Sequence, residues 1–102
     1  MRRVMVRYKV KADRAVENRE FIEKVFEELQ VATPAGIRYA SLVGEDGVSF
    51  VHIASIETTD GSNPLGNLKA FHAFQADIEE RCEIQPEVTD LEEIGSFGLF
   101  GS

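Results

Sequence analysis

The stretch GIRYASLVGEDGVSFVHIASIE, residues 36–57, decides the fold because it holds two alternating runs of apolar residues around a turn. Asp46-Gly47 is typical of a β-hairpin turn, since both residue types tolerate a positive φ. With a two- or four-residue loop, the face that then forms carries Ile37, Tyr39, Ser41, Val43, Phe50, His52, Ala54 and Ile56. A three-residue loop would exchange the pairing of the faces, and the sequence leaves both alternatives open.

The residues before this hairpin predict one strand and one helix. Residues 3–10, RVMVRYKV, alternate with the two-residue period of a strand. Across residues 14–31 the apolar residues recur with helical spacing, and Asp13 stands where an N-cap residue would accept a backbone N–H. Pro34 and Gly36 both break helices, so the helix should end before them.

A second helix is predicted after a polar loop. It opens at Asn63-Pro64 or at Asn67, and Pro86 ends it. The residues along its apolar side are Leu68, Phe71, Gln75, Ile78 and Cys82, with Phe74 beside them.

The last strand is expected at about residues 88–97, with a bulge between Val88 and Leu91 where the apolar spacing slips by one. The tail, residues 98–102, is expected to fray. The order of elements is then βαββαβ, the ferredoxin-like α+β arrangement. We therefore expect a single domain over residues 1–102, a four-stranded antiparallel sheet with the first and third strands central and both helices on one face.

The composition excludes several classes of partner. Eleven Lys and Arg residues against eighteen Asp and Glu residues give a net charge of −7, an acidic field that repels nucleic acids and anionic membranes. No apolar run is long enough to span a bilayer, and the alternating N-terminal residues do not form a signal peptide. Cys82 is the only cysteine, which fits the reducing cytoplasm. His52 and His72 lie far apart without a cluster of acids, so we expect no metal site.

The hairpin also predicts a homodimer. Two helices cover only one face of a sheet, yet both hairpin faces are apolar, with Phe50 and Ile56 on one face and Val51 and Ile53 on the other. An uncovered apolar face of several hundred Å² marks an interface. We expect a second copy to pack against it sheet to sheet, with twofold symmetry.

The segments DGVSFVHIASIE and FHAFQADIEERC, with the order of elements and the chain length, resemble the dimeric α/β-barrel superfamily and, within it, the antibiotic-biosynthesis-monooxygenase-like group. The resemblance covers nearly the whole chain and implies two ferredoxin-like subunits whose sheets join into one barrel. It also implies oxygenation or isomerisation of a small aromatic or polyketide-type molecule, without a cofactor, in a cleft between helices and sheet. Oxygenase and haem-degrading members typically line this cleft with a tryptophan, a histidine or an asparagine. The lack of any tryptophan here argues against haem degradation.

His52 is the candidate catalytic residue, because a neutral imidazole can take a proton from a phenolic substrate near neutral pH. The alternative is a core histidine whose ring nitrogens bond Ser41, Tyr39 or the backbone. The residues expected to bind the substrate are Tyr8, Tyr39, Ser41, Phe50 and His72, each of which could instead be an ordinary core or surface residue. Two functions remain open at this level, a cofactor-free enzyme and a non-catalytic homodimer that binds a small molecule or serves as an assembly module.

Overall fold

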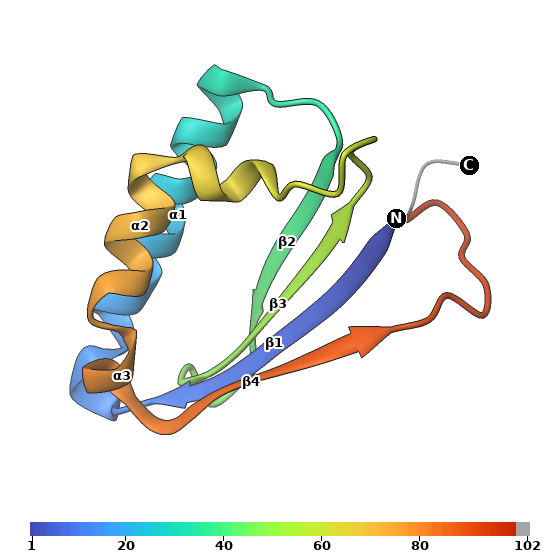
Figure 1. The fold of residues 1–102 in the computed structure, drawn as a ribbon. Coiled ribbons are helices and arrows are strands. Elements are labelled where there is room, and N and C mark those ends of the chain that lie inside the picture. The colour runs from blue at the N-terminus through green and yellow to red at the C-terminus, as the bar shows by residue number, and fades with distance from the viewer. Residues whose placement is uncertain (100–102) are drawn as a thin grey trace.

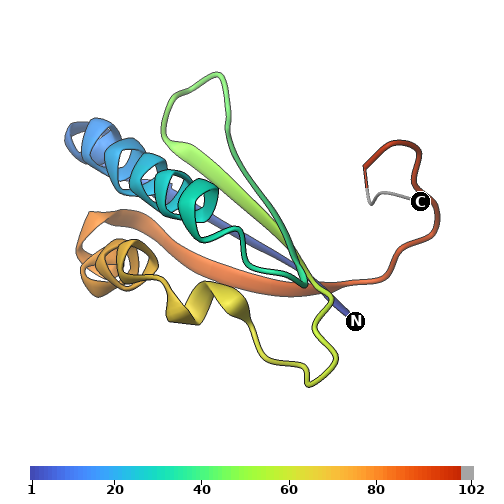
Figure 2. The same ribbon diagram turned by 90° about the horizontal axis from the view of Figure 1, so that it is seen from above.

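The computed structural model describes residues 1–99, which form a four-stranded antiparallel sheet with helices on one face (Figure 1). In chain order the elements are β1 (Arg2–Val10), the 3-10 turn η1 (Ala12–Arg14), α1 (Ala15–Ala32), β2 (Ile37–Val43), β3 (Ser49–Ile56), the 3-10 turn η2 (Pro64–Asn67), α2 (Lys69–Ala76), α3 (Ile78–Arg81) and β4 (Cys82–Leu91). The strand order β2-β3-β1-β4 makes β1 and β3 central. Seen from above, α1 and α2 run side by side over the sheet (Figure 2). The predicted ferredoxin-like fold is confirmed.

The hairpin between β2 and β3 has a four-residue loop, residues 45–48, which is the longer of the two loop lengths that keep the predicted faces together. Val43 pairs with Phe50, and Ser41 pairs with His52. The Asp46 carboxylate accepts the backbone N–H groups of Val48 and Ser49 at 3.0 and 2.9 Å, which with the Ser49 hydroxyl lowers the pKa of Asp46 to about 2. The turn therefore fixes the register, and this register directs His52 toward the helices.

The start of α1 differs from the prediction, because Asp13 is not its N-cap. Asp13 lies within η1, and the cap position belongs to Arg14, which makes no side-chain capping bond. The chain tightens into the 3-10 turn first, with the Arg14 N–H donating to the Lys11 carbonyl at 2.9 Å. Arg14 then donates from Nε to Glu17 at 2.6 Å. A 3-10 turn with a local ion pair thus stands where the sequence predicted a capping side chain.

The predicted second helix and last strand are wrong in their boundaries. The helix ends at Arg81 instead of Pro86, and β4 begins at Cys82 instead of near residue 88. Pairing with β1 decides this, since Val10 lies opposite Cys82. Pro86 is tolerated because β4 is an edge strand, where a missing N–H breaks no ladder bond when it faces away from the neighbour.

The irregularities of β4 also lie earlier than predicted. The register with β1 shifts between Glu87 and Ile84 and again between Ile84 and Cys82, whereas Val88 to Leu91 pair regularly. Ile94, predicted to lie in the strand, is outside it. Of the tail predicted to fray, residues 100–102 lie outside the described part of the chain.

The core lies between the helices and the sheet. Its buried apolar residues are Tyr8, Val10, Val25, Phe50, Leu65, Leu68, Phe74 and Cys82. The Glu28 carboxylate of α1 accepts the N–H of Ala70 at 2.8 Å and so caps α2, which has no cap of its own. This contact ties the two helices together above the sheet. Over residues 1–99, no helix has the length and apolar character needed to cross a membrane.

The sheet face turned away from the helices has an apolar centre. Met5 and Ala40 lie on either side of Ile53, because β1 and β2 both pair with β3. Val51 lies opposite Leu42, and the exposed fraction of Leu42 is 55%. We call these five residues the outer patch.

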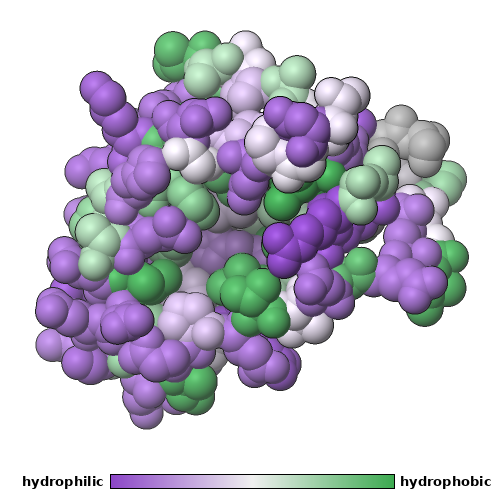
Figure 3. Space-filling view, in the orientation of Figure 1, coloured by the Kyte–Doolittle hydropathy of each residue, from purple (hydrophilic) through white to green (hydrophobic). Residues whose placement is uncertain are grey.

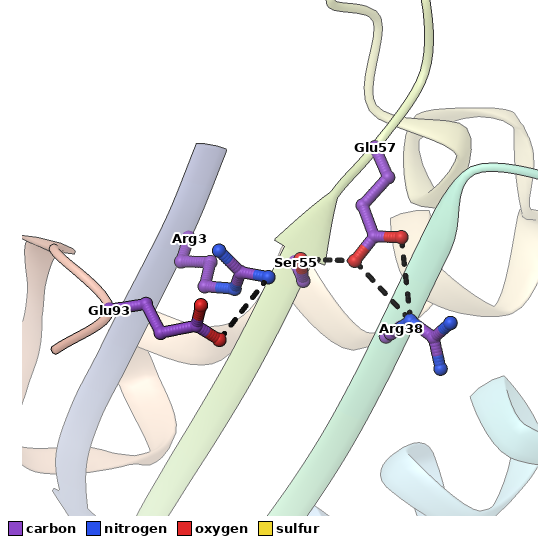
Figure 4. Close-up of polar contacts among 5 residues, drawn as sticks. All are labelled: Arg3, Arg38, Ser55, Glu57 and Glu93. Atoms are coloured by element: carbon purple, nitrogen blue, oxygen red, sulfur yellow. Dashed lines mark hydrogen bonds and ion pairs between the residues drawn. The ribbon is translucent and has the colours of Figure 1, made fainter. Parts of the chain in front are cut away.

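Charged groups from neighbouring strands gather at the end of the sheet where β3 ends (Figure 4). The Glu57 carboxylate accepts the Ser55 hydroxyl at 2.7 Å and the Arg38 Nε–H at 3.4 Å. Arg3 pairs with Glu93 at 3.7 Å, just after β4. Beyond that ion pair the chain extends away from the sheet, and its apolar residues Ile94, Phe97 and Leu99 are all exposed (Figure 1).

Candidate functional site

A cavity of about 300 Å³ lies between the inner sheet face and α2. Its walls are formed by Val4, Val6, Tyr8, Tyr39, His52, Ala54, Asn63, Leu65, Phe71, Phe74, Gln75, Ile78, Pro86 and Val88. The space-filling view shows a hollow near the middle of this side of the molecule, with apolar groups at its border (Figure 3). The walls are mostly apolar; of their polar residues, Tyr8 and Tyr39 contact His52, while Asn63 and Gln75 lie elsewhere in the lining.

His52 is almost completely buried, with 4% of its surface exposed, and both ring nitrogens are engaged. Its Nε2 lies 2.7 Å from the Tyr8 hydroxyl. Its Nδ1 lies 2.7 Å from the Ser41 hydroxyl and 2.9 Å from the Tyr39 hydroxyl. Burial lowers the pKa of His52 to about 4, so the ring is neutral at physiological pH.

Aromatic rings hold the imidazole in place. The rings of Tyr8 and Tyr39 lie nearly parallel to that of His52, with centroids at 5.4 and 5.9 Å. Phe74 of α2 closes the third side at 5.4 Å, tilted by 56°. Burial raises the pKa of both tyrosines, so both hydroxyls stay protonated. The imidazole therefore has a fixed orientation.

Asn18 and Arg81 extend this network, and the sequence analysis missed both. Asn18 Nδ2 donates to the Tyr8 hydroxyl at 3.0 Å, and Arg81 Nε donates to Asn18 Oδ1 at 3.1 Å. Arg81 has no exposed surface, donates from Nη2 to the Phe74 carbonyl at 2.6 Å and lies over the Phe21 ring at 4.6 Å. Helical spacing could have identified Asn18, because it lies four residues before Ile22, on the predicted apolar side of the first helix.

No protein-family model and no curated protein sequence matches this chain. Solved structures do match it. An antibiotic biosynthesis monooxygenase superimposes with a TM-score of 0.75 at 14% identity, covering 93% of this chain and 100% of that one. The protein Rv0793 from Mycobacterium tuberculosis gives 0.74 at 16% identity, covering 93% of this chain and 96% of that one. SnoaB, a cofactor-independent oxygenase from Streptomyces nogalater, gives 0.68 at 15% identity, covering 95% and 96%.

This chain has the fold of the antibiotic-biosynthesis-monooxygenase-like proteins. At such low identity the likeness establishes the ferredoxin-like architecture alone. The chemistry of this monooxygenase-like fold has to be argued from the residues around its own cavity.

Four of the six candidate residues lie together in this monooxygenase-like fold, namely His52, Tyr8, Tyr39 and Ser41. Phe50 is buried behind Tyr8, with ring centroids 5.6 Å apart, and is not among the residues that line the cavity. His72 is exposed on α2 and bonds the Gly66 carbonyl from Nε2 at 2.7 Å. His72 therefore lies outside the network around His52.

The arrangement suits a small aromatic ligand with one polar oxygen. The apolar walls would hold a planar ring system, and pockets of this size are at the lower end of those that bind small molecules. Tyr39, half-buried on the edge strand β2, lines the cavity together with Tyr8 and His52. Within residues 1–99, no group of three or more His, Cys, Asp and Glu side chains is placed to hold a metal ion.

Proposed function

We propose that this protein is a cofactor-independent enzyme, monooxygenase-like or isomerase-like, that acts on a small aromatic or polyketide-type molecule in the cavity under α2. The observation that carries the proposal is a neutral histidine, bonded by three hydroxyl groups, in the wall of a mostly apolar cavity. Strongly perturbed titratable groups in a cleft are typical of active sites. The cofactor-independent oxygenase among the proteins of similar fold supports the same class of reaction.

In this proposal His52 is the acid–base group of the reaction. Both of its nitrogens are bonded to hydroxyl groups, so it exchanges protons with a ligand through a hydroxyl and not directly. Tyr39 contacts the ligand oxygen, while Tyr8 and Ser41 hold the imidazole. A hydroxyl that passes a proton along a short hydrogen bond needs no metal or prosthetic group.

The second candidate is a non-catalytic homodimer that binds a small molecule or serves as an assembly module. The feature in its favour is that every ring nitrogen of His52 is already paired, as in a structural core histidine. The lone buried thiol of Cys82, whose pKa is raised by burial, adds no nucleophile to the site. Such a thiol also fits the reducing cytoplasm in which we expect the protein to work.

Either function would use a homodimer formed through the outer patch. An apolar patch of this kind, bordered by paired charges, is typical of an interface. The exposed Ile94 and Phe97 would add apolar area from the chain beyond β4. A second copy packed sheet to sheet would remove both from water.

The deciding experiment measures oxygen uptake with a naphthoquinol probe, corrected for the rate in buffer alone. Wild-type protein should accelerate uptake, and His52→Gln should lower the rate about a hundredfold or more, the usual scale for loss of an acid–base group. His72→Gln is the matched control, since His72 lies outside the network, and should keep the wild-type rate. Binding of the probe without any accelerated uptake would favour the non-catalytic homodimer.

A further inference from the structure

The buried network is one continuous chain of hydrogen bonds from a cation to the cavity. Its members are Arg81, Asn18, Tyr8, His52 and Tyr39, with Ser41 beside the last step. Arg81 is buried, yet over residues 1–99 no carboxylate forms an ion pair with it, and its buried Nη1 has no hydrogen-bond partner. Glu17 acts on Arg81 electrostatically, but it is paired directly with Arg14. A buried cation without a directly paired carboxylate is costly, which points to a role for Arg81 beyond packing.

Arg81 fixes the direction of every hydrogen bond in this chain. A guanidinium only donates, so the atom of Asn18 that faces it must be the carbonyl Oδ1. The amide Nδ2 of Asn18 therefore donates to the Tyr8 oxygen. Tyr8 has a single proton, and its other partner is His52 Nε2.

The same rule sets the tautomer of His52. Because Tyr8 donates to Nε2, the neutral ring carries its proton on Nδ1. The Nδ1–H group then donates to the Ser41 and Tyr39 oxygens at 2.7 and 2.9 Å. Tyr39 receives a hydrogen bond, so its own proton is available for another oxygen, either that of the neighbouring Ser41 hydroxyl or that of a ligand in the cavity.

We propose that Arg81 and Asn18 are positioning residues that hold neutral His52 as the Nδ1–H tautomer, so that Tyr39 offers the cavity a hydrogen-bond donor and selects a carbonyl or ionised phenolic oxygen. The statement about the ligand rests on the function proposed above, whereas the tautomer does not. The other tautomer would turn the Tyr39 proton toward Nδ1 and leave a lone pair in the cavity, which suits a ligand hydroxyl. The two tautomers therefore select opposite ligand chemistries.

The charge of Arg81 favours the same outcome. Donors aligned from a buried cation toward the cavity stabilise negative charge at the far end, and they do so strongly where water is excluded. A phenolic ligand would thus bind as its anion and lose its proton to the solvent on entry. In this tautomer His52 acts through the hydrogen bond that it donates, so a confirmed Nδ1–H ring would replace the acid–base role given to His52 above by an electrostatic one.

The tautomer is read directly from the ¹⁵N resonances of labelled histidine, with His72→Gln used to assign the two rings. We expect Nδ1 of His52 to be protonated and Nε2 to be bare in the wild type. In Asn18→Asp the new carboxylate can still pair with Arg81 but accepts the Tyr8 proton, so the tautomer should invert to Nε2–H. A wild-type Nε2–H ring, or an unchanged tautomer in the variant, overturns the proposal. The wild-type spectrum decides the direction even if the variant does not fold.

The ligand part is tested with para-nitrophenol, whose absorbance reports its ionisation. The wild type should bind the anion about tenfold more tightly than the neutral phenol, equivalent to lowering the pKa of the probe by about one unit. Asn18→Asp should remove this preference. A probe that binds in the neutral form, or does not bind, overturns the ligand part. Neither measurement needs turnover, so a confirmed tautomer with no oxygen uptake would reject the catalytic function and keep the network.

Discussion

The two faces of this sheet have opposite relationships between polarity and burial. On the inner face, His52 and Tyr8 are buried, and the hydroxyls of Tyr8 and of half-buried Ser41 both bond the His52 ring. On the outer face, apolar residues such as Leu42 meet the solvent while the charges pair at the border. An ordinary one-domain protein would place these groups the other way round. This difference is the reason for proposing a ligand at the inner face and a second copy at the outer face.

The first test of this comparison is to lower the pH. Burial lowers the pKa of His52 to about 4, from 6.5, so the folded chain binds fewer protons than the unfolded chain between these values. The stability contributed by the neutral ring is complete above about pH 6.5 and is lost as the pH falls toward 4. The loss should be roughly 3 kcal/mol, at about 1.4 kcal/mol for each pH unit.

Urea unfolding of the wild type and of His52→Gln at several pH values checks this loss. The variant keeps the contributions of carboxylates such as Asp46, whose pKa is about 2, and lacks only that of the imidazole. The two stability curves should converge as the pH falls. Parallel curves would show that His52 is not held neutral by burial.

The second test removes the imidazole altogether. His52→Ala leaves the hydroxyls of Tyr8, Tyr39 and Ser41 without their partner and opens a void, and we expect the free energy of unfolding to fall by about 2 kcal/mol. Thermal or urea unfolding measures it at pH 7. Ala54→Gly on the same strand is the comparison for a small deletion without polar partners, and an equal loss in both would reject the network as a source of stability.

The third test addresses the outer face. Ile53→Lys places a charge in the centre of the outer patch, beside Met5 and Ala40, and should weaken self-association at least about tenfold because the charge would lose water at the interface. Sedimentation velocity over a range of concentrations measures this. The ¹⁵N spectrum of His52 should stay as in the wild type, since residue 53 points to the other face. A wild-type protein that sediments as a monomer would refute the homodimer.

The smallest expected effect concerns Tyr39. Tyr39→Phe removes one hydroxyl, but Ser41 still accepts from His52 Nδ1 at 2.7 Å, so the free energy of unfolding should change by about 1 kcal/mol or less. Binding of the para-nitrophenol anion should fall much more than stability does. A variant that loses stability yet binds the anion as before would show that Tyr39 supports the fold and not the ligand.

Local patterns in the sequence were enough for β1 and the hairpin. The alternation of residues 37–43 and 49–56 and the Asp46-Gly47 turn depend on neighbours along the chain, so they predicted the face that joins Ser41 to His52. The start of β4 could not be predicted in this way. Its residues follow a helix without a break, and only pairing of Cys82 with Val10 of β1 makes them a strand.

By itself, then, the sequence determined the order of the elements, the central strands, and His52 with three of the residues around it, because periodicity and turn chemistry are local properties. Only the tertiary structure decided that Asn18 and Arg81, separated by 63 positions, meet behind Tyr8. A hydrogen bond between distant elements leaves no periodic trace in the chain, and the proton direction that follows from it exists only once the donor Arg81 is in place. The fold could be predicted from the pattern of apolar residues. The direction of the hydrogen bonds in the site depends instead on one contact across the core, between Arg81 and Asn18.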